Sequence, residues 1–231
     1  MLILAFETSA KAGSVALMED GRLLGESYQN TGLTHSQTIM TMAQDLLTAC
    51  GHTPADVQAV AVAAGPGSFT GVRIGVAAAK GFAWGKELPC CGVSTLEAMA
   101  LHLGVYDGYV LPVMDARRQQ VYTATFLAEN GTLQRITPDR AISLEELKKE
   151  LIWLEKNVFL VGDGSILCYN TLKEDVPCLI LPLEGRMHQR AVGVGLAALA
   201  QENPDDPAAL TPNYLRLSQA ERERNEKLQQ K

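Results

Sequence analysis

A glycine-rich segment between a predicted strand and a predicted helix constrains the fold of this chain more than any other feature. Residues 65–75 read GPGSFTGVRIG, between a strand-like run at 57–64 and an alanine-rich helical run at 72–84. Such a turn exposes backbone N–H groups at a helix N-terminus, where an anion is favoured. Its glycines also let another backbone approach closely. The sequence therefore predicts either a phosphate contact or a tight backbone contact at this turn.

The segment matches neither of two common phosphate-binding loops. A P-loop has Lys and then Ser or Thr after its last glycine, whereas Gly71 is followed by Val72 and Arg73. A dinucleotide fingerprint would place Thr70 at its third glycine. The acid that should follow about twenty residues on would be Glu87, which lies in an expected helix-exit turn. Both standard loops are excluded.

The composition of the 231 residues is that of a globular protein, with 47% hydrophobic and 20% charged residues. That length suits one large domain or two small ones. The net charge of −6 argues against a chain that grips nucleic acid unaided, because such proteins usually carry a basic face. No apolar run reaches the roughly 18 residues that a membrane span requires, so no membrane partner is expected.

The five cysteines favour a cytoplasmic location. Their number is odd, no C-x-x-C occurs, and no histidine lies at ligand spacing from any of them. Buried free thiols in a reducing compartment are therefore expected. These spacings predict no metal site.

Strand and helix patterns alternate along the chain and predict an α/β protein of two lobes. The first lobe is expected over residues 1–104. The second, over 105–217, follows a flexible boundary at 104–108, and its last segment is left free to pack back on the first lobe. Residues 218–231 are mixed in charge and lack apolar anchors, so a disordered tail is predicted there.

Local signals fix several element ends. Asp20-Gly21 and Asn130-Gly131 are typical of hairpin turns. Thr34 is expected to cap a helix that ends at Gly51. Ser143 with Glu146 forms the pattern of a capping box at the start of another helix.

Five motifs, in order along the chain, resemble one protein family. The opening residues 3–9 and 14–17 are similar to the first hairpin of the actin-like ATPase fold, and GPGSFTGVRIG matches the signature of the bacterial TsaB (YeaZ) family. Further matches are GVSTL at 92–96, MDARR at 114–118 with VY at 121–122, and P-x-YLR at 212–216. The resemblance implies a two-lobed α/β fold of the actin-like ATPase (ASKHA, ribonuclease-H-like) type.

The resemblance also implies a function. The family belongs to the machinery that makes threonylcarbamoyladenosine beside the anticodon of tRNA, and it is similar to the catalytic subunit TsaD, which carries a metal-binding H-x-E-G-H. That segment falls on residues 95–99 here, with Thr95 and Met99 in place of both histidines. The resemblance therefore implies a scaffold subunit with no catalytic residue, no metal and no required cofactor. Its expected partners are a TsaD-like catalytic subunit and a TsaE-like ATPase, with tRNA met only inside the complex.

A rival interpretation is a self-sufficient ATP-dependent kinase or hydrolase that works in the cleft between the lobes. The fold usually has Asp at the end of its first strand, where it helps to hold a nucleotide-bound cation. Here that residue is Glu7, whose carboxylate is displaced by about 1.5 Å, enough to disturb a magnesium shell. The missing histidines and Glu7 both argue against the rival.

Two groups of residues are candidates for contacts. An apolar stripe at helical spacing is typical of a core face, but the resemblance favours a partner surface shared with the helix after the glycine loop; the candidates are His35, Ile39, Met42, Ala43, Leu46, Arg73, Val76, Ala77 and Lys80. Around the loop, a vestigial nucleotide contact and simple tight packing are equal alternatives; the candidates are Thr8, Ser9, Gly65, Gly67 and Ser68.

Some questions stay open at the level of sequence. Asp115 and Arg117 form either a buried ion pair, the favoured reading, or a contact surface. Pairing of the free chain with a second copy through the same helices is left open. So is the presence of ATP or ADP at a subunit interface.

Overall fold

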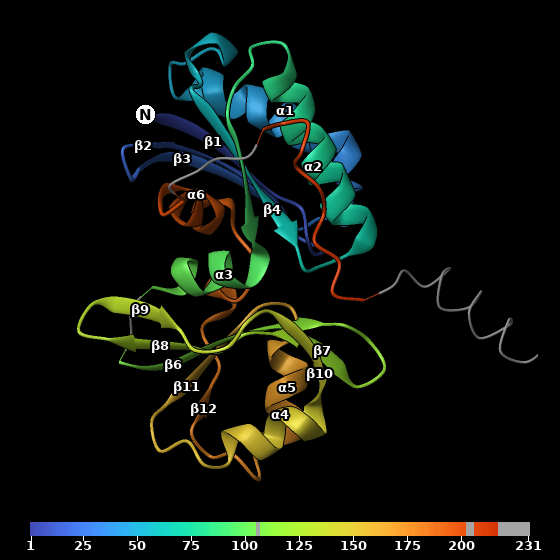
Figure 1. The fold of residues 1–231 in the computed structure, drawn as a ribbon, viewed down its shortest axis with the longest axis vertical. Helices are drawn as coiled ribbons and strands as arrows, with labels where there is room; N and C mark the ends of the chain where they lie inside the picture. The colour runs from blue at the N-terminus through green and yellow to red at the C-terminus, as the bar shows by residue number, and fades with distance from the viewer. Residues whose placement is uncertain (105–106, 202–205, 217–231) are drawn as a thin grey trace, which may run out of the picture.

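The computed structural model describes residues 1–104, 107–201 and 206–216, which form two α/β lobes stacked end to end (Figure 1). The expected tail at 218–231 lies outside the described residues, as does part of the expected boundary at 104–108. None of the helices in the described ranges has the length and apolar character needed to cross a membrane.

The first lobe contains a five-stranded sheet in the order β3-β2-β1-β4-β5. The hairpin strands β1, β2 and β3 are antiparallel, whereas β1, β4 and β5 are parallel. The elements of this lobe are β1 (Leu2–Glu7), β2 (Gly13–Glu19), β3 (Arg22–Gln29), α1 (His35–Ala49), η1 (Pro54–Asp56), β4 (Ala59–Gly65), α2 (Phe69–Trp84), β5 (Cys90–Ser94) and α3 (Thr95–Leu103).

Both faces of this sheet are covered, which explains why β1 and β4 are continuous apolar runs rather than alternating ones. Helices α1 and α2 cover the face that carries Leu4, Phe6 and Val62. The other face carries mostly alanines, among them Ala5 and Ala61, and is covered from the opposite side (Figure 1).

The second lobe has a seven-stranded mixed sheet in which β6 is central. Its main order is β10-β7-β6-β11-β12, and β8 pairs with both β6 and β9. Helices α4 and α5 cover one face of this sheet, around Leu111, Leu147 and Leu160. The elements are β6 (Gly108–Asp115), β7 (Gln120–Thr123), β8 (Phe126–Glu129), β9 (Thr132–Arg135), β10 (Arg140–Ser143), α4 (Leu144–Leu151), β11 (Val158–Val161), α5 (Ser165–Leu172), β12 (Leu179–Ile180), η2 (Glu184–Arg186) and α6 (Ala191–Leu199).

The chain returns to the first lobe with α6, which lies on the small-residue face of the first sheet (Figure 1). Its glycines permit that close approach: a Cβ on Gly193 would overlap the carbonyl oxygen of Ala98, and one on Gly195 would overlap Met18. Helix α3 lies between the lobes and contributes Leu96 to a second apolar cluster with residues of β6 and β8.

Most of the local signals were read correctly. Asp20-Gly21 and Asn130-Gly131 adopt the left-handed conformations of hairpin turns, and Ser143 forms the expected capping box with Glu146. Thr34 does precede α1, but its side chain makes no capping hydrogen bond. Helix α2 starts at Phe69, earlier than predicted, because the Ser68 side chain caps it by accepting from the Gly71 N–H.

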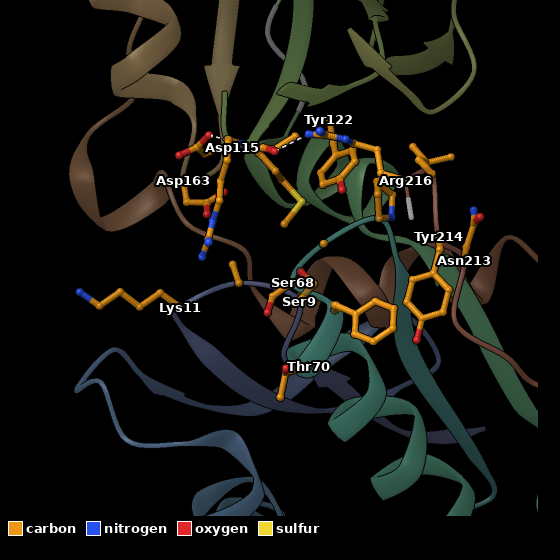
Figure 2. A pocket seen from close by; sticks show the side chains of 18 residues that line it. Ser9, Lys11, Ser68, Thr70, Asp115, Tyr122, Asp163, Asn213, Tyr214 and Arg216 are labelled. Carbon is orange, nitrogen blue, oxygen red and sulfur yellow. Dashed lines mark hydrogen bonds between the residues drawn. The ribbon is translucent and has the colours of Figure 1, made fainter. Parts of the chain in front are cut away.

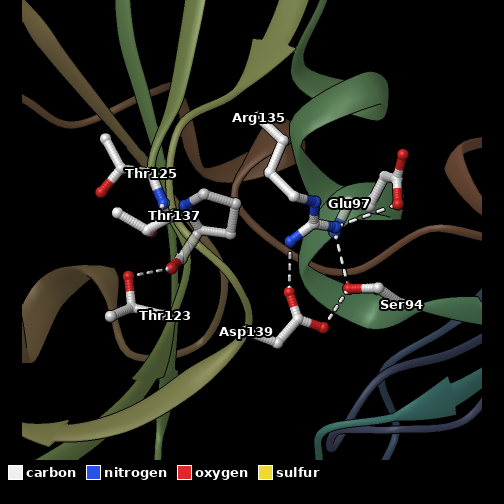
Figure 3. A network of polar contacts seen from close by, with 8 residues as sticks. Ser94, Glu97, Thr123, Thr125, Arg135, Thr137 and Asp139 are labelled. Atoms are coloured by element: carbon white, nitrogen blue, oxygen red, sulfur yellow. Dashed lines mark hydrogen bonds and ion pairs between the residues drawn. The ribbon is translucent and has the colours of Figure 1, made fainter.

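An ionic network joins the two lobes at α3 (Figure 3). The guanidinium of Arg135, on β9, donates to Asp139 and, at 3.0 Å, to Glu97 on α3. The hydroxyl of Ser94, the residue before α3, donates to the other oxygen of Asp139. Arg135 also lies over the ring of Phe126, 4.6 Å from its centre. Charged groups from both lobes therefore hold one another in place.

Candidate functional site

The glycines of the loop make room for other parts of the same chain. A Cβ on Gly67 would lie 2.6 Å from the carbonyl oxygen of Ser9, and one on Gly71 would be still closer to the carbonyl oxygen of Thr8. At Gly65, where φ is +120°, a Cβ would overlap the carbonyl oxygen of Asn213. Real Cβ atoms do not approach carbonyl oxygens so closely, so each position requires glycine.

Hydrogen bonds fix the same contacts. The N–H of Ser68 donates to the carbonyl of Ser9 at 2.7 Å, and the hydroxyl of Thr8 donates to the carbonyl of Gly71 at 2.8 Å. Of the two alternatives left open for this loop, tight backbone packing is observed at these residues, and a nucleotide contact stays a prediction. The candidate nucleotide residues separate accordingly: Thr8 and Gly65 face the packed interior, while Ser9, Gly67 and Ser68 line a cavity.

That cavity lies between the lobes and has a volume of about 720 Å³ (Figure 2), within the roughly 300–1,000 Å³ of typical ligand sites. Five separate segments of the chain form it. They are the turn after β1, the N-terminus of α2, the end of β6 with the β6–β7 turn and β7, the end of β11, and the end of the described chain. The polar and aromatic lining residues are Ser9, Lys11, Ser68, Phe69, Thr70, Asp115, Arg117, Tyr122, Asp163, Asn213, Tyr214 and Arg216.

Residues 206–216, here called the C-terminal strap, run along α2 and close one side of the cavity. The ammonium of Lys80 donates to the carbonyls of Ala208 and Leu210, both at 3.1 Å. The N–H of Asn213 donates to the carbonyl of Ala64 at 2.6 Å. At its end, Arg216 donates to the carbonyl of Ala116, so the strap reaches the second lobe.

Two carboxyl groups, one from each lobe, lie near the interior end of the cleft: Glu7 is buried beneath it, and Asp163 lines it. Glu7 is fully buried, and one of its oxygens accepts from the N–H of Ser9 at 2.6 Å. Its other oxygen has no hydrogen-bond partner among the described residues. Desolvation raises the pKa of Glu7 to about 7, with Asp163 adding to the shift. Desolvation by the surrounding walls also raises the pKa of Asp163, although its side chain is open to the cavity.

The positions matched to metal-binding histidines lie inside the junction of the lobes. Met99 is 1% exposed and packs with Val110 and Phe126, and Thr95 is fully buried. Glu97, the residue between them, is engaged by Arg135. Within the described residues, no group of three or more His, Cys, Asp or Glu side chains could hold a metal ion.

The predicted partner stripe on α1 is wrong for most of its residues. Ile39, Ala43 and Leu46 are buried in the core of the first lobe, and Met42 packs against that core. The Nε2 of His35 bonds to the carbonyl of Ala10 at 2.7 Å. Apolar spacing indicated which face of the helix is buried, but the burial is against its own sheet. A glutamate at Met42 would therefore destabilise the lobe.

The candidates on α2 are also reassigned. Val76 is buried in the core, and Lys80 holds the strap. Arg73 donates to the Tyr214 hydroxyl at 2.7 Å and lies 3.8 Å from the centre of the Phe69 ring. Arg73 and Ala77 are both exposed, and Ala77 is the candidate that neither enters the core nor holds the strap.

The expected buried ion pair between Asp115 and Arg117 is absent from the described residues. Both Asp115 and Arg117 are exposed, and a carboxylate oxygen of Asp115 accepts from the backbone N–H of Arg117 at 2.7 Å. The favoured reading of a buried pair was wrong, because the two residues form a tight turn at the mouth of the cavity. Sequence reasoning missed that Arg216 and Tyr214 line the cavity, although the P-x-YLR motif that contains them was recognised.

Comparison with known proteins places the chain in a family. A family model described as TsaD, tRNA N6-adenosine threonylcarbamoyltransferase, matches residues 29–222. The tRNA threonylcarbamoyladenosine biosynthesis protein TsaB of Bacillus subtilis (strain 168) is 35% identical over 226 residues, which cover 96% of both chains. The chain belongs to the TsaB (YeaZ) family. The TsaB of Escherichia coli (strain K12) is 40% identical over 167 residues, 71% of this chain and 72% of its own.

Solved structures agree with the TsaB assignment. A Pseudomonas aeruginosa protein described as similar to peptidase YeaZ superposes with a TM-score of 0.77 at 26% identity, over 93% of this chain and 99% of its own. Component A of the Acidaminococcus fermentans (R)-2-hydroxyglutaryl-CoA dehydratase gives a TM-score of 0.52 at 12% identity over 86% of this chain, a likeness in fold alone. The predicted two-lobed actin-like ATPase fold is confirmed.

Proposed function

We propose that this chain acts in the biosynthesis of tRNA threonylcarbamoyladenosine as a non-catalytic subunit that supports a TsaD-like catalytic subunit. The observation that carries the proposal is the enclosure of Thr95 and Met99 in the junction between the lobes. A threonine hydroxyl and a thioether are poor ligands for the metal of a TsaD-like site. Transfer of the threonylcarbamoyl group to the adenosine would therefore take place on the partner.

The surface proposed for that partner is the outer face of α1 and α2, which lie side by side (Figure 1). On α2 the exposed residues recur every three or four positions and are mostly small around the middle; they are Thr70, Arg73, Ala77, Gly81 and Trp84. On α1, Met40 is 44% exposed, and Trp84 at the end of α2 is 70% exposed. A Cβ on Gly81 would meet nothing within 4 Å, so this helix leaves room for another backbone. Small central residues flanked by large apolar ones suit helix–helix packing between subunits.

A single substitution on this face tests the partner surface. Ala77→Arg places a long cation at the centre of the exposed stripe without entering the core, so it should abolish co-elution with the TsaD-like subunit in size-exclusion chromatography with light scattering. The matched control is Asn170→Arg, on an exposed position of α5 in the other lobe. Circular dichroism should show both variants folded. Retention of the complex by Ala77→Arg would overturn the assignment of this surface.

The remaining partners follow from the same proposal. The TsaE-like ATPase and tRNA would be met by the assembled complex, and any ATP or ADP would sit at a subunit interface. The same helical face would pair two copies of the free chain, and Ala77→Arg should leave it monomeric in the same assay.

The rival function, an ATP-dependent kinase or hydrolase, makes an opposite prediction. Such an enzyme would turn over ATP as an isolated chain, and Glu7→Ala would abolish the turnover. The scaffold proposal expects no turnover above a blank in either protein. The engagement of the loop glycines by Thr8, Ser9 and Asn213 supports the scaffold, because those glycines leave no free cradle for a triphosphate.

A further inference from the structure

Cationic side chains gather at the mouth of the interlobe cavity, although the chain as a whole carries a net charge of −6. Lys11 comes from the turn after β1, Arg117 from the turn after β6, and Arg216 from the strap. Figure 2 shows Lys11 and Arg216 at opposite ends of the cavity, with Ser9 and Ser68 between them. The two carboxylates of the lining, Asp115 and Asp163, leave this group with an excess of positive charge.

The turn that carries Arg117 is held in a strained conformation. Arg117, Arg118 and Gln119 have φ angles of +63°, +55° and +58°, a run of left-handed residues without glycine. Each costs roughly 1–2 kcal/mol relative to ordinary backbone. The turn is closed by hydrogen bonds between Ala116 and Gln120 at 3.0 Å and is tied to Leu144 at 3.1 Å. Strain that the surroundings enforce in this way is typical of sites that position a side chain for binding.

An aromatic surface lies beside these cations. The rings of Phe69 and Tyr214 stack with their centres 4.6 Å apart and their planes inclined by 26°. Tyr214 is 40% exposed, and Tyr122 is half-buried in the opposite wall. A flat, partly exposed aromatic ring next to a cation is a surface on which a nucleic-acid base stacks.

A buried hydroxyl lies at the wall of the cavity. Ser9 is one of the lining residues, and its fully buried side chain lies next to the Glu7 carboxyl. Ser9 lies beside Ser68 at the N-terminus of α2, where the helix dipole favours an anion. Because Asp163 occupies the inner end, a polyphosphate is disfavoured there, and the cations at the mouth suit one singly charged phosphate.

From these observations we propose that the mouth of the cavity binds one nucleotide of an RNA strand. The phosphodiester lies at the Lys11 and Arg117 side of the mouth, and the base stacks on Tyr214 at the Arg216 side. Although the chain is negatively charged overall, it places three cations here. They add a local contact to an RNA that the rest of the assembly also binds. The proposal rests on the proposed function, which supplies the tRNA.

The test uses the assembled complex and a fluorescently labelled anticodon stem–loop, with affinity measured by fluorescence anisotropy over a range of salt. The double variant Lys11→Gln with Arg117→Gln should weaken binding about tenfold or more and reduce the salt slope by about 1–2. Tyr214→Leu should weaken binding about tenfold, the order of one stacked base, with an unchanged salt slope. The control is Lys149→Gln, an exposed cation on α4 of the second lobe. Unchanged affinity in the double variant would overturn the proposal.

Two further measurements separate the alternatives. Adenosine monophosphate is titrated against the same proteins. If substitution of Lys11 and Arg117 weakens the binding of this nucleotide but not that of the stem–loop, the ligand is a free nucleotide and the RNA proposal is wrong. Co-elution with the catalytic subunit is measured first for every variant. If the parent chain does not assemble, the proposed function fails, and the anisotropy comparison is made on the chain alone at about 50 mM salt, where phosphate contacts are strongest.

Discussion

Glu7, the last residue of the central strand β1, is buried and has a structural role. Its carboxyl is sealed beneath the cleft, accepts the N–H of Ser9 and has one oxygen without a described partner. It does not line the cavity, so it cannot reach a ligand there. The extra methylene relative to aspartate is accommodated in the buried site, and burial keeps the acid neutral below about pH 7.

This burial predicts a pH-dependent stability. A carboxyl whose pKa rises from 4.5 to about 7 on folding leaves stability intact below pH 4.5 and lowers it as the pH rises through 7, because the folded chain must then hold a buried charge. Glu7→Gln removes that charge and should raise the free energy of unfolding by about 3 kcal/mol at pH 8. The gap should close by pH 4.5 in urea titrations. An equal gap at both pH values would show that ionisation of Glu7 has no part in it.

The cationic residues of α2 illustrate a second point at this scale. Arg73 is exposed and Lys80 is half-buried, yet both bind the strap. Arg73 donates to the Tyr214 hydroxyl, and Lys80 donates to the Ala208 carbonyl. Local sequence patterns do not predict these contacts, because the strap is more than 120 residues away from Arg73 and Lys80 in the chain.

At the scale of elements, α2 uses its glycines for two different purposes. Gly71 and Gly75, in its first turns, allow the helix to lie directly on Thr8. Gly81, less than two turns after Gly75, faces open space. The same residue type therefore marks packing against β1 at one end and a surface open to a partner at the other.

The two uses separate in an alanine comparison. Gly71→Ala forces a methyl group into the carbonyl oxygen of Thr8 and should cost about 1–3 kcal/mol or more. Gly81→Ala adds a methyl to an open helical surface and should stabilise the chain by roughly 0.5–1 kcal/mol, because glycine is a poor helix former. Thermal or urea unfolding of the two variants measures both values. Similar effects from both would mean that the helix does not pack on Thr8 in this way.

Sequence reasoning was reliable for elements whose signal is local. Turns at Asp20-Gly21 and Asn130-Gly131 and the capping box at Ser143 depend on a few adjacent residues and were recognised. Helix α5 was missed because its cap, Gly164, offers no side chain and its apolar residues show almost no periodicity. The apolar stripe of α1 was recognised but assigned to the wrong neighbour, because core and subunit surfaces share the same spacing.

The cavity was the least predictable part for a related reason. It draws on Lys11, Ser68, Arg117 and Arg216 from four distant segments, and their meeting depends on how the lobes are stacked. A motif search could find each segment separately, as it did for the loop and for P-x-YLR, but spacing within a motif carries no information about the distance between motifs.

At the scale of the whole molecule, the two lobes are joined at several points. Arg135 links them at α3, Arg216 links them through the strap, and Arg190, beside α6, pairs with Glu26 of β3 at 2.6 Å. These connections favour a fixed arrangement of the lobes, which suits the proposed scaffold role.

The ionic network at α3 should therefore contribute to cooperative unfolding. Arg135→Met keeps the side-chain volume but leaves Asp139, whose side chain is 12% exposed, without its cation, a loss of about 1–3 kcal/mol. Calorimetry should show a lower melting temperature and a broader transition. Lys149→Met, which breaks an exposed pair with Glu145, should change stability by less than about 1 kcal/mol. Equal effects of the two would mean that the network does not couple the lobes.

The return of α6 to the first sheet has a consequence for synthesis on the ribosome. One face of that sheet, including Ile3 and Ala61, is covered by residues 191–199, and the strap at 206–216 completes the packing around α2. The nascent first lobe thus keeps part of an apolar face uncovered until residues 191–199 have been translated. Chain order and folding order differ here, and a product released before α6 would expose that face to chaperones and proteases.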